Sequence, residues 1–355
     1  MSEPWLITGG AGFVGSNLAI FLKEKNPGRR LVAFDNLKRR GAELNLPRLC
    51  NAGVEFLHGD IRCPEDLEAI GPFSLLIECS AEPSVMAGVS NSPGYLLQTN
   101  LVGTINCLEQ CRKYKSDFLF LSTSRVYSQR ALNGIQFTAA ETRLVPVIPQ
   151  PIPGFSSEGV AEDFPLSGPR SLYGATKLAS ELLIEEYAHL YGIRTVINRC
   201  GVIAGPWQMG KVDQGFVALW VARHLLGGDL AYIGYGGTGK QVRDILHIDD
   251  LAALIEIQLG DIEKFMGKVF NVGGGQKGSV SLAELTRICQ RLTGRSITIG
   301  SIPQTRSTDI PFYVTDSGRI RELAMWAPRK APEEIVEDFC TWIRRNEPMV
   351  RHILA

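Results

Sequence analysis

The sequence has no excess charge of either sign and no long hydrophobic run. Lys and Arg together number 37, equal to the number of Asp and Glu, among 355 residues. This balance gives no reason to expect binding to nucleic acid or to an anionic membrane, because both select clustered positive charge. Since no apolar stretch of about 18 residues is present, and no basic segment precedes an apolar one at the N-terminus, we expect neither a membrane span nor a signal peptide.

The cysteines lack the spacing of a zinc site or of a disulfide framework. Eight of them are scattered over positions 50, 63, 79, 107, 111, 200, 289 and 340. Cys107 and Cys111 lie four apart within a helical pattern, but no second pair completes a tetrahedral set. We therefore expect reduced, mostly buried thiols in a cytoplasmic protein, with no bound metal. The sequence also has no internal repeat and no low-complexity tract.

A glycine-rich segment near the N-terminus has the order of a nucleotide-binding unit. Trp5 to Thr8 predicts a short buried strand, and Ser16 to Lys23 has the apolar period of a helix. Between them Gly9, Gly12 and Gly15 are spaced three apart, a variant of the dinucleotide fingerprint. Such a turn lets the backbone approach a pyrophosphate, which the amides and dipole at the helix start then hold.

Asp35 bears on the choice between NAD and NADP. It follows a second apolar strand, Leu31 to Phe34, and stands 20 residues after Gly15. A carboxylate there can accept a hydrogen bond from a ribose 2′-hydroxyl and would repel a 2′-phosphate, which favours NAD over NADP. The cations from Lys38 to Arg40 leave NADP open, because a cation could accept that phosphate. A glycine-rich loop without a nucleotide is the alternative interpretation of the whole segment.

Apolar strands alternate with helical patterns up to about residue 200, which is typical of βαβ units and a parallel sheet. Further strands are predicted at 54–58, 75–79, 118–121 and 195–198, with helices at 101–115 and 173–190. We expect an α/β protein with a Rossmann-type doubly wound parallel sheet formed by residues 1–201 and about 240–275. A smaller C-terminal mixed α/β domain, about 202–239 and 276–355, is expected to bind the substrate.

Polar segments follow three of the predicted strands: Gly59-Asp60-Ile61, Ser80-Ala81-Glu82 and Ser122-Thr123-Ser124. Because parallel strands end at one edge of the sheet, these segments are candidate parts of one site. Residues 130–169 are rich in Pro, Gly and Ser and poor in regular patterns. A loop of this length is usually functional or disordered, and we favour a loop that covers the substrate over a linker.

Tyr173 and Lys177 are the candidate proton-transfer pair. Spaced i, i+4, they share one face of a helix. A nearby ammonium lowers the pKa of a Tyr from about 10, so the pair can pass a proton at neutral pH. The spacing alone is weak evidence, because it is more often that of a solvated helix face. Thr123 at a strand end could orient a substrate hydroxyl, or could only cap the next turn.

The chain resembles the extended short-chain dehydrogenase/reductases of the nucleotide-sugar epimerase and dehydratase group, from about residue 5 to residue 342. The motifs that carry the resemblance are Thr8 to Gly15, Asp35-Asn36, Gly59 to Ile61, Asn100 to Thr104, Thr123 with Val126-Tyr127, Tyr173 with Lys177, Arg243 to Asp250, Phe270 to Gly273, and Arg306 with Asp309. The resemblance implies a Thr–Tyr–Lys set that moves a proton while NAD exchanges a hydride with a sugar carbon.

The resemblance also implies roles for individual residues. The expected catalytic residues are Thr123, Tyr173 and Lys177. The expected NAD contacts are Gly9, Gly12, Phe13, Val14, Gly15, Asp35, Asn36, Asp60, Ile61, Ser80, Ala81, Asn100, Tyr173 and Lys177. The expected contacts to a nucleotide-sugar substrate are Thr123, Ser124, Arg125, Gln214, Arg243 and Arg306. Arg243 and Arg306 are assigned to the diphosphate because a guanidinium forms a planar fork for phosphate oxygens. For Arg243, the alternative is a surface salt bridge with Asp244.

Two features bear on the reaction. The 4,6-dehydratases carry Asp-Glu after the catalytic Thr, where this chain has Ser124-Arg125, and neither residue is a usable acid at neutral pH. This favours redox-neutral epimerisation through a transient keto sugar. The stretches 35–42, 207–216 and 239–244 resemble the CDP-tyvelose (CDP-paratose) 2-epimerase subgroup, which implies oxidation at C2 of a CDP-sugar. A homodimer built on the helices at 101–114 and 173–190 is also implied.

The sequence departs from the family pattern at the end of the fourth strand. It has Glu78-Cys79-Ser80-Ala81 in place of His-x-Ala-Ala, and Glu82-Pro83 in place of Gln-Pro. A carboxylate at position 82 could alter substrate choice, or burial could raise its pKa. The alternative functions are a UDP-sugar 4-epimerase, an NDP-sugar 4,6-dehydratase or a reductase. A further alternative of another class is an NAD-sensing scaffold protein without catalysis.

Overall fold

The computed structural model describes residues 3–210 and 214–354, which form two compact units. As far as their residues are described, the first comprises Met1–Val126, Ser171–Arg199 and Ala252–Phe270, and the second comprises Tyr127–Arg170, Cys200–Leu251 and Asn271–Ala355. Residues 127–170 and 240–251 thus lie in the second unit, whereas the predicted boundaries group them with the Rossmann domain. The division into a cofactor domain and a substrate domain stays a prediction.

The first unit is built on a seven-stranded sheet with the strand order β14-β10-β5-β4-β1-β2-β3. The strands are β1 (Trp5–Thr8), β2 (Leu31–Asp35), β3 (Glu55–His58), β4 (Leu75–Glu78), β5 (Asp117–Thr123), β10 (Thr195–Cys200) and β14 (Lys268–Val272). β1 pairs in parallel with both β2 and β4, and the pairs β2–β3 and β4–β5 are also parallel. A chain that starts centrally and then adds strands on both sides has the Rossmann topology. The predicted fold class is confirmed.

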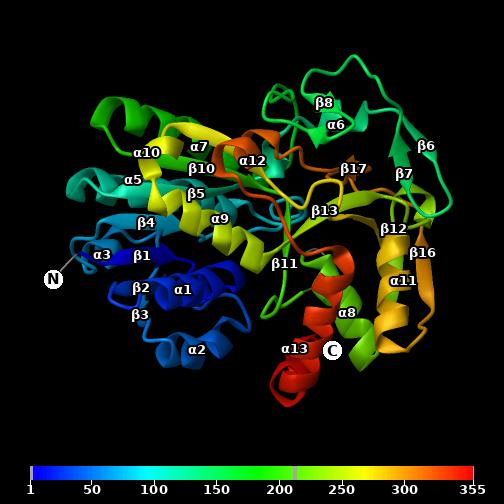
Figure 1. Ribbon diagram of the computed structural model, residues 1–355, viewed down its shortest axis with the longest axis horizontal. Coiled ribbons are helices and arrows are strands. Elements are labelled where there is room, and N and C mark those ends of the chain that lie inside the picture. Colours follow the sequence, from blue (N-terminus) through cyan, green and yellow to red (C-terminus); the bar gives the residue numbers. More distant parts are fainter. Residues whose placement is uncertain (1–2, 211–213, 355) are drawn as a thin grey trace. The chain divides into compact units, whose positions relative to one another are not determined.

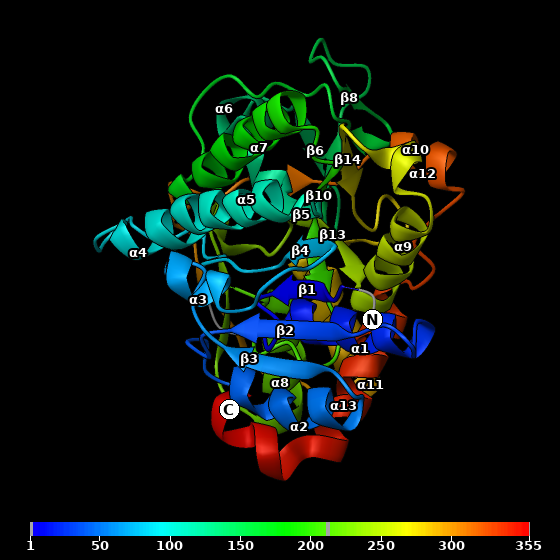
Figure 2. The ribbon, with the colours of Figure 1, turned by 90° about the vertical axis from the view of Figure 1, so that its left-hand side faces the viewer.

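Helices cover both faces of this sheet. They are α1 (Phe13–Lys25), α2 (Leu46–Asn51), α3 (Pro64–Glu68), α4 (Gly94–Leu97), α5 (Gly103–Tyr114), α7 (Leu172–Tyr191), α9 (Ile248–Gly260) and α10 (Ile262–Phe265). Short 3₁₀ turns occur at Ala42–Asn45 and Ser124–Val126, and a π-helical turn at Gln98–Val102. Figure 2 shows α5 and α7 side by side on one face and α1 on the other. Among the described residues, none of the helices has the length and apolar character needed to cross a bilayer.

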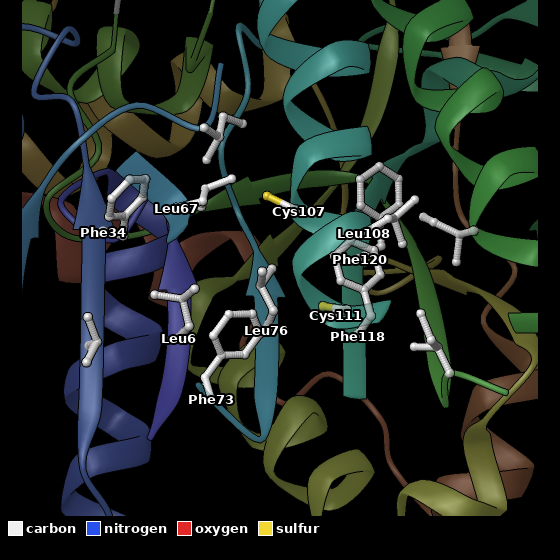
Figure 3. Close-up of a cluster of buried hydrophobic side chains, with 14 of the residues drawn as sticks. Leu6, Phe34, Leu67, Phe73, Leu76, Cys107, Leu108, Cys111, Phe118 and Phe120 are labelled. Carbon is white, nitrogen blue, oxygen red and sulfur yellow. The ribbon is translucent and has the colours of Figure 1, made fainter. Parts of the chain in front are cut away.

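A buried apolar cluster joins the sheet to α5 and α7. It contains Leu76 from β4, Phe118 and Phe120 from β5, and Cys107 and Cys111 from α5, among others, each fully buried (Figure 3). Burying one such side chain contributes about 1.5–3 kcal/mol. The cluster therefore holds the two helices at a defined height on the strands, and the residues at the strand ends are positioned with them.

The second unit is assembled from short, irregularly ordered strands. Its main sheet has β11 (Val202–Ala204), β13 (Val242–His247) and β15 (Ser279–Ser281) in order, with β17 (Phe312–Tyr313) also paired to β13. β12 (Leu230–Ile233) pairs with β16 (Ile299–Ile302). The helices are α6 (Gln129–Asn133), α8 (Phe216–Leu226), α11 (Leu282–Thr293), α12 (Gly318–Ala324) and α13 (Pro332–Leu354), with a 3₁₀ turn at Tyr235–Gly237. Of these, α8, α11 and α13 pack together (Figure 1).

The segment 130–169 forms two small hairpins, β6 (Phe137–Ala139) with β7 (Leu144–Pro146) and β8 (Phe155–Ser156) with β9 (Gly159–Val160). Backbone hydrogen bonds tie it to the second unit. Val160 N donates to Val314 O at 2.8 Å, and Leu144 N donates to Lys240 O at 2.9 Å. These bonds are the physical reason that the segment belongs to this unit.

Candidate active site

The glycine-rich turn between β1 and α1 leaves no room for a side chain at Gly9 or Gly15. Gly9 has a φ of +64°, and a Cβ at this position would lie 2.8 Å from backbone atoms of Cys79 and Ser80. A Cβ on Gly15 would lie 2.2 Å from the carbonyl oxygen of Gly9. The turn therefore packs against both the loop after β4 and the start of α1. Only glycine fits at 9 and 15, which explains two of the three residues of the fingerprint.

The third glycine begins the helix. Gly12 is the N-cap of α1, and the first turn of this helix, with Phe13 and Val14, carries no acidic side chain. A helix N-terminus bears unpaired amides and a partial positive charge. Because neither a Cβ at 12 nor a carboxylate opposes it, this end of α1 fits a pyrophosphate.

Asp35 ends β2 beside this turn. Its Oδ2 accepts a hydrogen bond from Ala11 N at 3.1 Å, and its Oδ1 accepts one from Leu37 N at 2.8 Å. Burial raises the pKa of Asp35, and these backbone bonds oppose that rise. Each carboxylate oxygen has a second lone pair, so Asp35 keeps the capacity to accept from a ribose hydroxyl.

Asn36 and Asp60 are joined directly. Asn36 Nδ2 donates to Asp60 Oδ2 at 2.8 Å, and Arg62 donates to the same carboxylate through Nε and Nη2. Burial would raise the pKa of Asp60, but the bonds from Arg62 and Asn36 lower it to about 2. The ring of Tyr95 has Arg62 and the Lys38 ammonium each at 4.8 Å from its centroid. Sequence reasoning missed Arg62 and Tyr95, which no motif marks.

Asn100 holds the loop that follows β4. Its Oδ1 accepts from Glu82 N at 2.8 Å, and its Nδ2 donates to Glu82 O at 3.0 Å. These two bonds fix the backbone just after Ser80 and Ala81, which are both partly exposed. Ile61 is buried in the apolar cluster.

Lys177 is the residue for which the structure decides between the two interpretations of the Tyr-x-x-x-Lys spacing. Its side chain is 2% exposed, and its ammonium lies 4.2 Å from the centroid of the Phe120 ring. A solvated helix face is therefore wrong for this residue. Tyr173, in the first turn of α7, is partly exposed, and the Ser171 hydroxyl caps the helix by accepting from Gly174 N at 3.2 Å. A partly exposed Tyr one helical turn before a buried ammonium suits proton exchange with a ligand.

Thr123 lies next to the start of α7 through one backbone contact. Its Oγ1 accepts from Arg125 N at 3.2 Å, in the 3₁₀ turn that also contains Ser124. A Cβ on Gly174 would lie 2.1 Å from Arg125 O, so the helix packs on this turn without a side chain between them. The fold thus brings together the C-terminal end of β5, which bears Thr123, and the first turn of α7, which bears Tyr173.

Glu181, one turn beyond Lys177, is part of a buried ion pair that sequence reasoning missed. Arg199 on β10 donates to its carboxylate through Nε at 3.1 Å and Nη2 at 2.7 Å. Ser122, beside Thr123, donates to the same carboxylate. Arg199 is 5% and Glu181 2% exposed. The pair ties α7 to two strands; an arginine inside the apolar run 195–200 is the signal that could have revealed it.

Glu78 is a second buried acid, whereas the sequence analysis considered an effect of burial on the pKa only for Glu82. Glu78 is fully buried at the end of β4, whereas Glu82 is partly exposed. Burial raises the pKa of Glu78 to about 7, opposed by the charge of Lys177 and by a hydrogen bond from Thr104. A charged residue that ends the apolar run Leu75 to Ile77 was the available signal.

The predicted substrate contacts of the second unit are placed as follows. Arg243 on β13 donates through Nη1 to Val242 O and through Nη2 to Ile310 O, both at 2.7 Å. Its neighbour Asp244 is fully buried and accepts from Gly275 N at 3.0 Å. Arg306, before β17, and Gln214 are partly exposed, while Val212 and Asp213 of the subgroup motif lie outside the described residues.

All eight cysteines are free thiols, and those at 107, 111, 200, 289 and 340 are buried. Within residues 3–210 and 214–354, no group of three His, Cys, Asp or Glu side chains could hold a metal ion.

Comparison with known proteins places this arrangement in a family. The chain matches the NAD dependent epimerase/dehydratase family over residues 5–273. It is 32% identical to CDP-paratose 2-epimerase of Salmonella typhi over 95% of this chain and 98% of that protein. It is 27% identical to dTDP-glucose 4,6-dehydratase of Xanthomonas campestris pv. campestris (strain B100) over 99% and 95% of the two chains.

A solved structure is similar over nearly the whole length. UDP-glucuronic acid 4-epimerase from Bacillus cereus, in complex with UDP-glucuronic acid and NAD, superposes with a TM-score of 0.76 at 25% identity. The match covers 96% of this chain and 99% of that one. The family match spans residues 5–273, a range that contains the glycine turn, Asp35 and the Thr–Tyr–Lys residues. The chain belongs to the NAD-dependent epimerase/dehydratase family.

Proposed function

We propose that the protein is an enzyme that epimerises a nucleotide-linked sugar with NAD, acting at C2 of a CDP-sugar as CDP-paratose (CDP-tyvelose) 2-epimerase does. The observation that carries the reaction type is the buried Lys177 on the helix whose first turn bears Tyr173, packed on the turn that follows Thr123. The 32% identity over 95% of the chain supports the choice of sugar and nucleotide.

The cofactor half of the proposal uses the N-terminal turn. Bound NAD⁺ would accept a hydride from a sugar carbon and return it. Gly9, Gly12 and Gly15, with the start of α1, would hold its pyrophosphate, and Asp35 would accept from a ribose hydroxyl. Asn36, Asp60, Ile61, Ser80, Ala81 and Asn100 would shape the remainder of the site, as the family resemblance implies.

The protein's own chemistry is the movement of one proton. Tyr173 takes the proton of the sugar hydroxyl as the carbon becomes a ketone, and Lys177 stabilises the phenolate from which this proton transfer starts. Thr123 orients the same hydroxyl. When the keto sugar has presented its other face, Tyr173 gives the proton back. Hydride and proton both return, so the reaction has no net redox change.

The substrate half assigns phosphate recognition to the second unit. Arg243 donates to the backbone carbonyls of Val242 and Ile310, which orients the guanidinium. Arg243 and Arg306 would bind the diphosphate, and Ser124, Arg125 and Gln214 would contact the nucleotide sugar. These roles rest on the resemblance and on the affinity of guanidinium for phosphate.

A 4,6-dehydratase is the second candidate, because one such enzyme is 27% identical over nearly the whole chain. The two residues after Thr123 oppose it. Ser124 and Arg125 provide no carboxyl group to deliver the extra proton that elimination of water requires, since Arg stays protonated. Epimerisation needs no such group.

A substrate screen tests the function. The purified protein is incubated with CDP-, UDP-, GDP- and dTDP-sugars, and the products are examined by NMR for an inverted stereocentre. We expect inversion at C2 of a CDP-sugar, and release of about one equivalent of NAD⁺ on acid treatment. Loss of water would indicate the dehydratase, inversion at C4 a 4-epimerase, and consumption of added NADH a reductase. Binding of NAD without turnover of any sugar would indicate a scaffold.

Replacing Tyr173 tests the proton step. Tyr173→Phe should keep its NAD and lose turnover by about 10²- to 10⁴-fold, the usual contribution of a general acid–base residue. The matched control is Tyr191→Phe, the same change at an exposed position at the end of the same helix. Turnover that is equal in the two variants would refute the role of Tyr173.

A homodimer through the outer faces of α5 and α7 is part of the proposal. On α7, Leu182 is 58% and Leu190 64% exposed, so both are available to a second copy of the chain. Light scattering should give twice the monomer mass, and Leu182→Lys should reduce the measured mass. A monomeric wild type would contradict the prediction.

A cytoplasmic location is likewise proposed, on the ground that the thiols are free.

A further inference from the structure

Glu78 and the Lys177 ammonium lie on the same face of the seven-stranded sheet, beside Phe120. In the parallel pairing of β4 with β5, Glu78 is the direct partner of Phe120. Register partners on adjacent strands project to the same face of a sheet. The Lys177 ammonium lies over the ring of Phe120 at 4.2 Å. The carboxyl group and the ammonium are therefore buried above neighbouring strands, in the layer that Figure 3 shows around Phe120 and Cys107.

The hydrogen bonds around Glu78 fit a protonated carboxyl group. Thr104 Oγ1 lies 2.7 Å from Glu78 Oε1 and 3.0 Å from Asn100 O. A hydroxyl has one proton, so it cannot serve both acceptors fully. If Glu78 carries a proton on Oε1, it donates to Thr104, and the Thr104 hydroxyl donates its own proton to Asn100 O. If Glu78 is ionised, Thr104 donates to it, and Asn100 O loses the bond from Thr104 while it keeps one from Ser180 Oγ at 3.0 Å.

The other oxygen of Glu78 points to the same conclusion. Oε2 is buried and has no hydrogen-bond partner among the described residues. An ionised oxygen left in this way is costly, whereas a neutral carboxyl tolerates it better. The titratable groups that act on this site are Lys177 from α7 and Cys107 and Cys111 from α5, and both thiols are fully buried with raised pKa values. From β1, the register partner is Thr8, which does not titrate.

We propose that Glu78 is a positioning residue for the Tyr173–Lys177 pair, a buried carboxyl that holds a proton in the resting enzyme and sets the charge around the Lys177 ammonium. The inference rests on the proposed function only for the role of Tyr173 in turnover. The pKa of Glu78, raised to about 7, lets this carboxyl group exchange its proton near neutral pH. When Glu78 ionises, its negative charge offsets the ammonium, and Tyr173 holds its own proton more tightly.

The first test needs no substrate. In the NAD-loaded protein, the phenolate of Tyr173 is titrated by ultraviolet difference absorbance, with the same protein carrying Tyr173→Phe as background. In wild type we expect a broad transition, because two groups titrate against each other. In Glu78→Gln, which keeps the shape and stays neutral, we expect a single-proton curve with its midpoint lower by about one pH unit. The control is Glu185→Gln, the same change at an exposed position on α7.

An infrared measurement on the wild-type protein keeps the proposal testable if Glu78→Gln does not fold. The C=O band of one neutral carboxyl group should be present at about pH 6 and lost by about pH 8, as a group with a pKa of about 7 requires. Glu78→Asp should move that band. A carboxyl group that is ionised throughout, or a phenolate midpoint that is equal in Glu78→Gln and wild type, would overturn the inference.

The pH dependence of turnover then separates this role from a structural one. If the protein is an epimerase, Glu78→Gln should shift the acidic limb of the kcat profile to lower pH by about the same one unit, leaving KM for the sugar unchanged. An equal loss of kcat at every pH would show that Glu78 only supports the fold, and would overturn the proposal. A protein that turns over no sugar would refute the proposed function while the phenolate and infrared results still decide the role of Glu78.

Discussion

Two buried carboxyl groups on the α5–α7 side of the sheet, Glu181 and Glu78, are held in opposite ways. Glu181 accepts two hydrogen bonds from the Arg199 guanidinium and one from Ser122. Among residues 3–210 and 214–354, Glu78 has a single hydroxyl partner, Thr104, and one oxygen without a partner. A buried charge is stable only with a paired, hydrogen-bonded counter-charge. The first environment therefore suits a fixed ion pair that anchors α7, and the second suits a carboxyl group that keeps or releases a proton.

Replacing Arg199 should have the largest effect on the stability of the protein. Arg199→Met leaves the Glu181 carboxylate buried and unpaired, and we expect a loss of about 3–5 kcal/mol in the free energy of unfolding, measured with urea. The double variant Arg199→Met, Glu181→Leu should recover most of this loss, because no charge remains buried. A double variant as unstable as the single one would show that packing, and not the unpaired charge, is responsible.

The pH dependence of stability should reveal the second carboxyl group. The pKa of Glu78 is raised to about 7 from 4.5, so between these values the folded protein keeps a proton that the unfolded chain has lost. Stability from this group therefore falls as pH rises from about 4.5 to about 7, by roughly 3 kcal/mol. Glu78→Gln should lack this fall and gain on wild type between about pH 5 and about pH 8 in urea unfolding. Parallel pH profiles for the two proteins would contradict a neutral Glu78.

Two serines measure the contrast on a smaller scale. Ser122 donates to the charged Glu181, whereas Ser180 donates to the neutral carbonyl of Asn100 at 3.0 Å. Hydrogen bonds to charged groups contribute about 1.5–3 kcal/mol and those between neutral groups about 0.5–1.5. Ser122→Ala should therefore destabilise the protein more than Ser180→Ala, by about 1 kcal/mol in thermal or urea unfolding. A larger loss in Ser180→Ala than in Ser122→Ala would contradict the stronger hydrogen bond of Ser122 to the charged Glu181.

Much of the first unit could be predicted from local pattern. The apolar runs at 5–8, 31–34 and 75–79 correspond to β1, β2 and β4 within a residue or so, because buried parallel strands must be continuous apolar segments. The helix from 173 to 190 is α7, which spans Leu172–Tyr191. The glycine spacing also had a local cause, since positions 9 and 15 have no space for a Cβ.

The second unit was less predictable. Its strands are two to six residues long and are drawn from widely separated segments, so no period can develop within one strand. The hairpins in 130–169 are held by backbone bonds such as that of Val160 N to Val314 O, 154 residues apart in sequence. Such pairings depend on the folded backbone and leave no local signal.

By itself, the sequence determined the Rossmann class, the glycine turn with Asp35, and the identity of Thr123, Tyr173 and Lys177 as candidates, because each depends on residue type and short-range spacing. Only the tertiary structure decided that Lys177 is buried over Phe120, that Glu181 is paired with Arg199, and that Glu78 is not paired with an arginine in this way. The reason is physical: the charge state of a carboxyl or ammonium group depends on what surrounds it in the interior, and those neighbours come from strands and helices far apart in the chain.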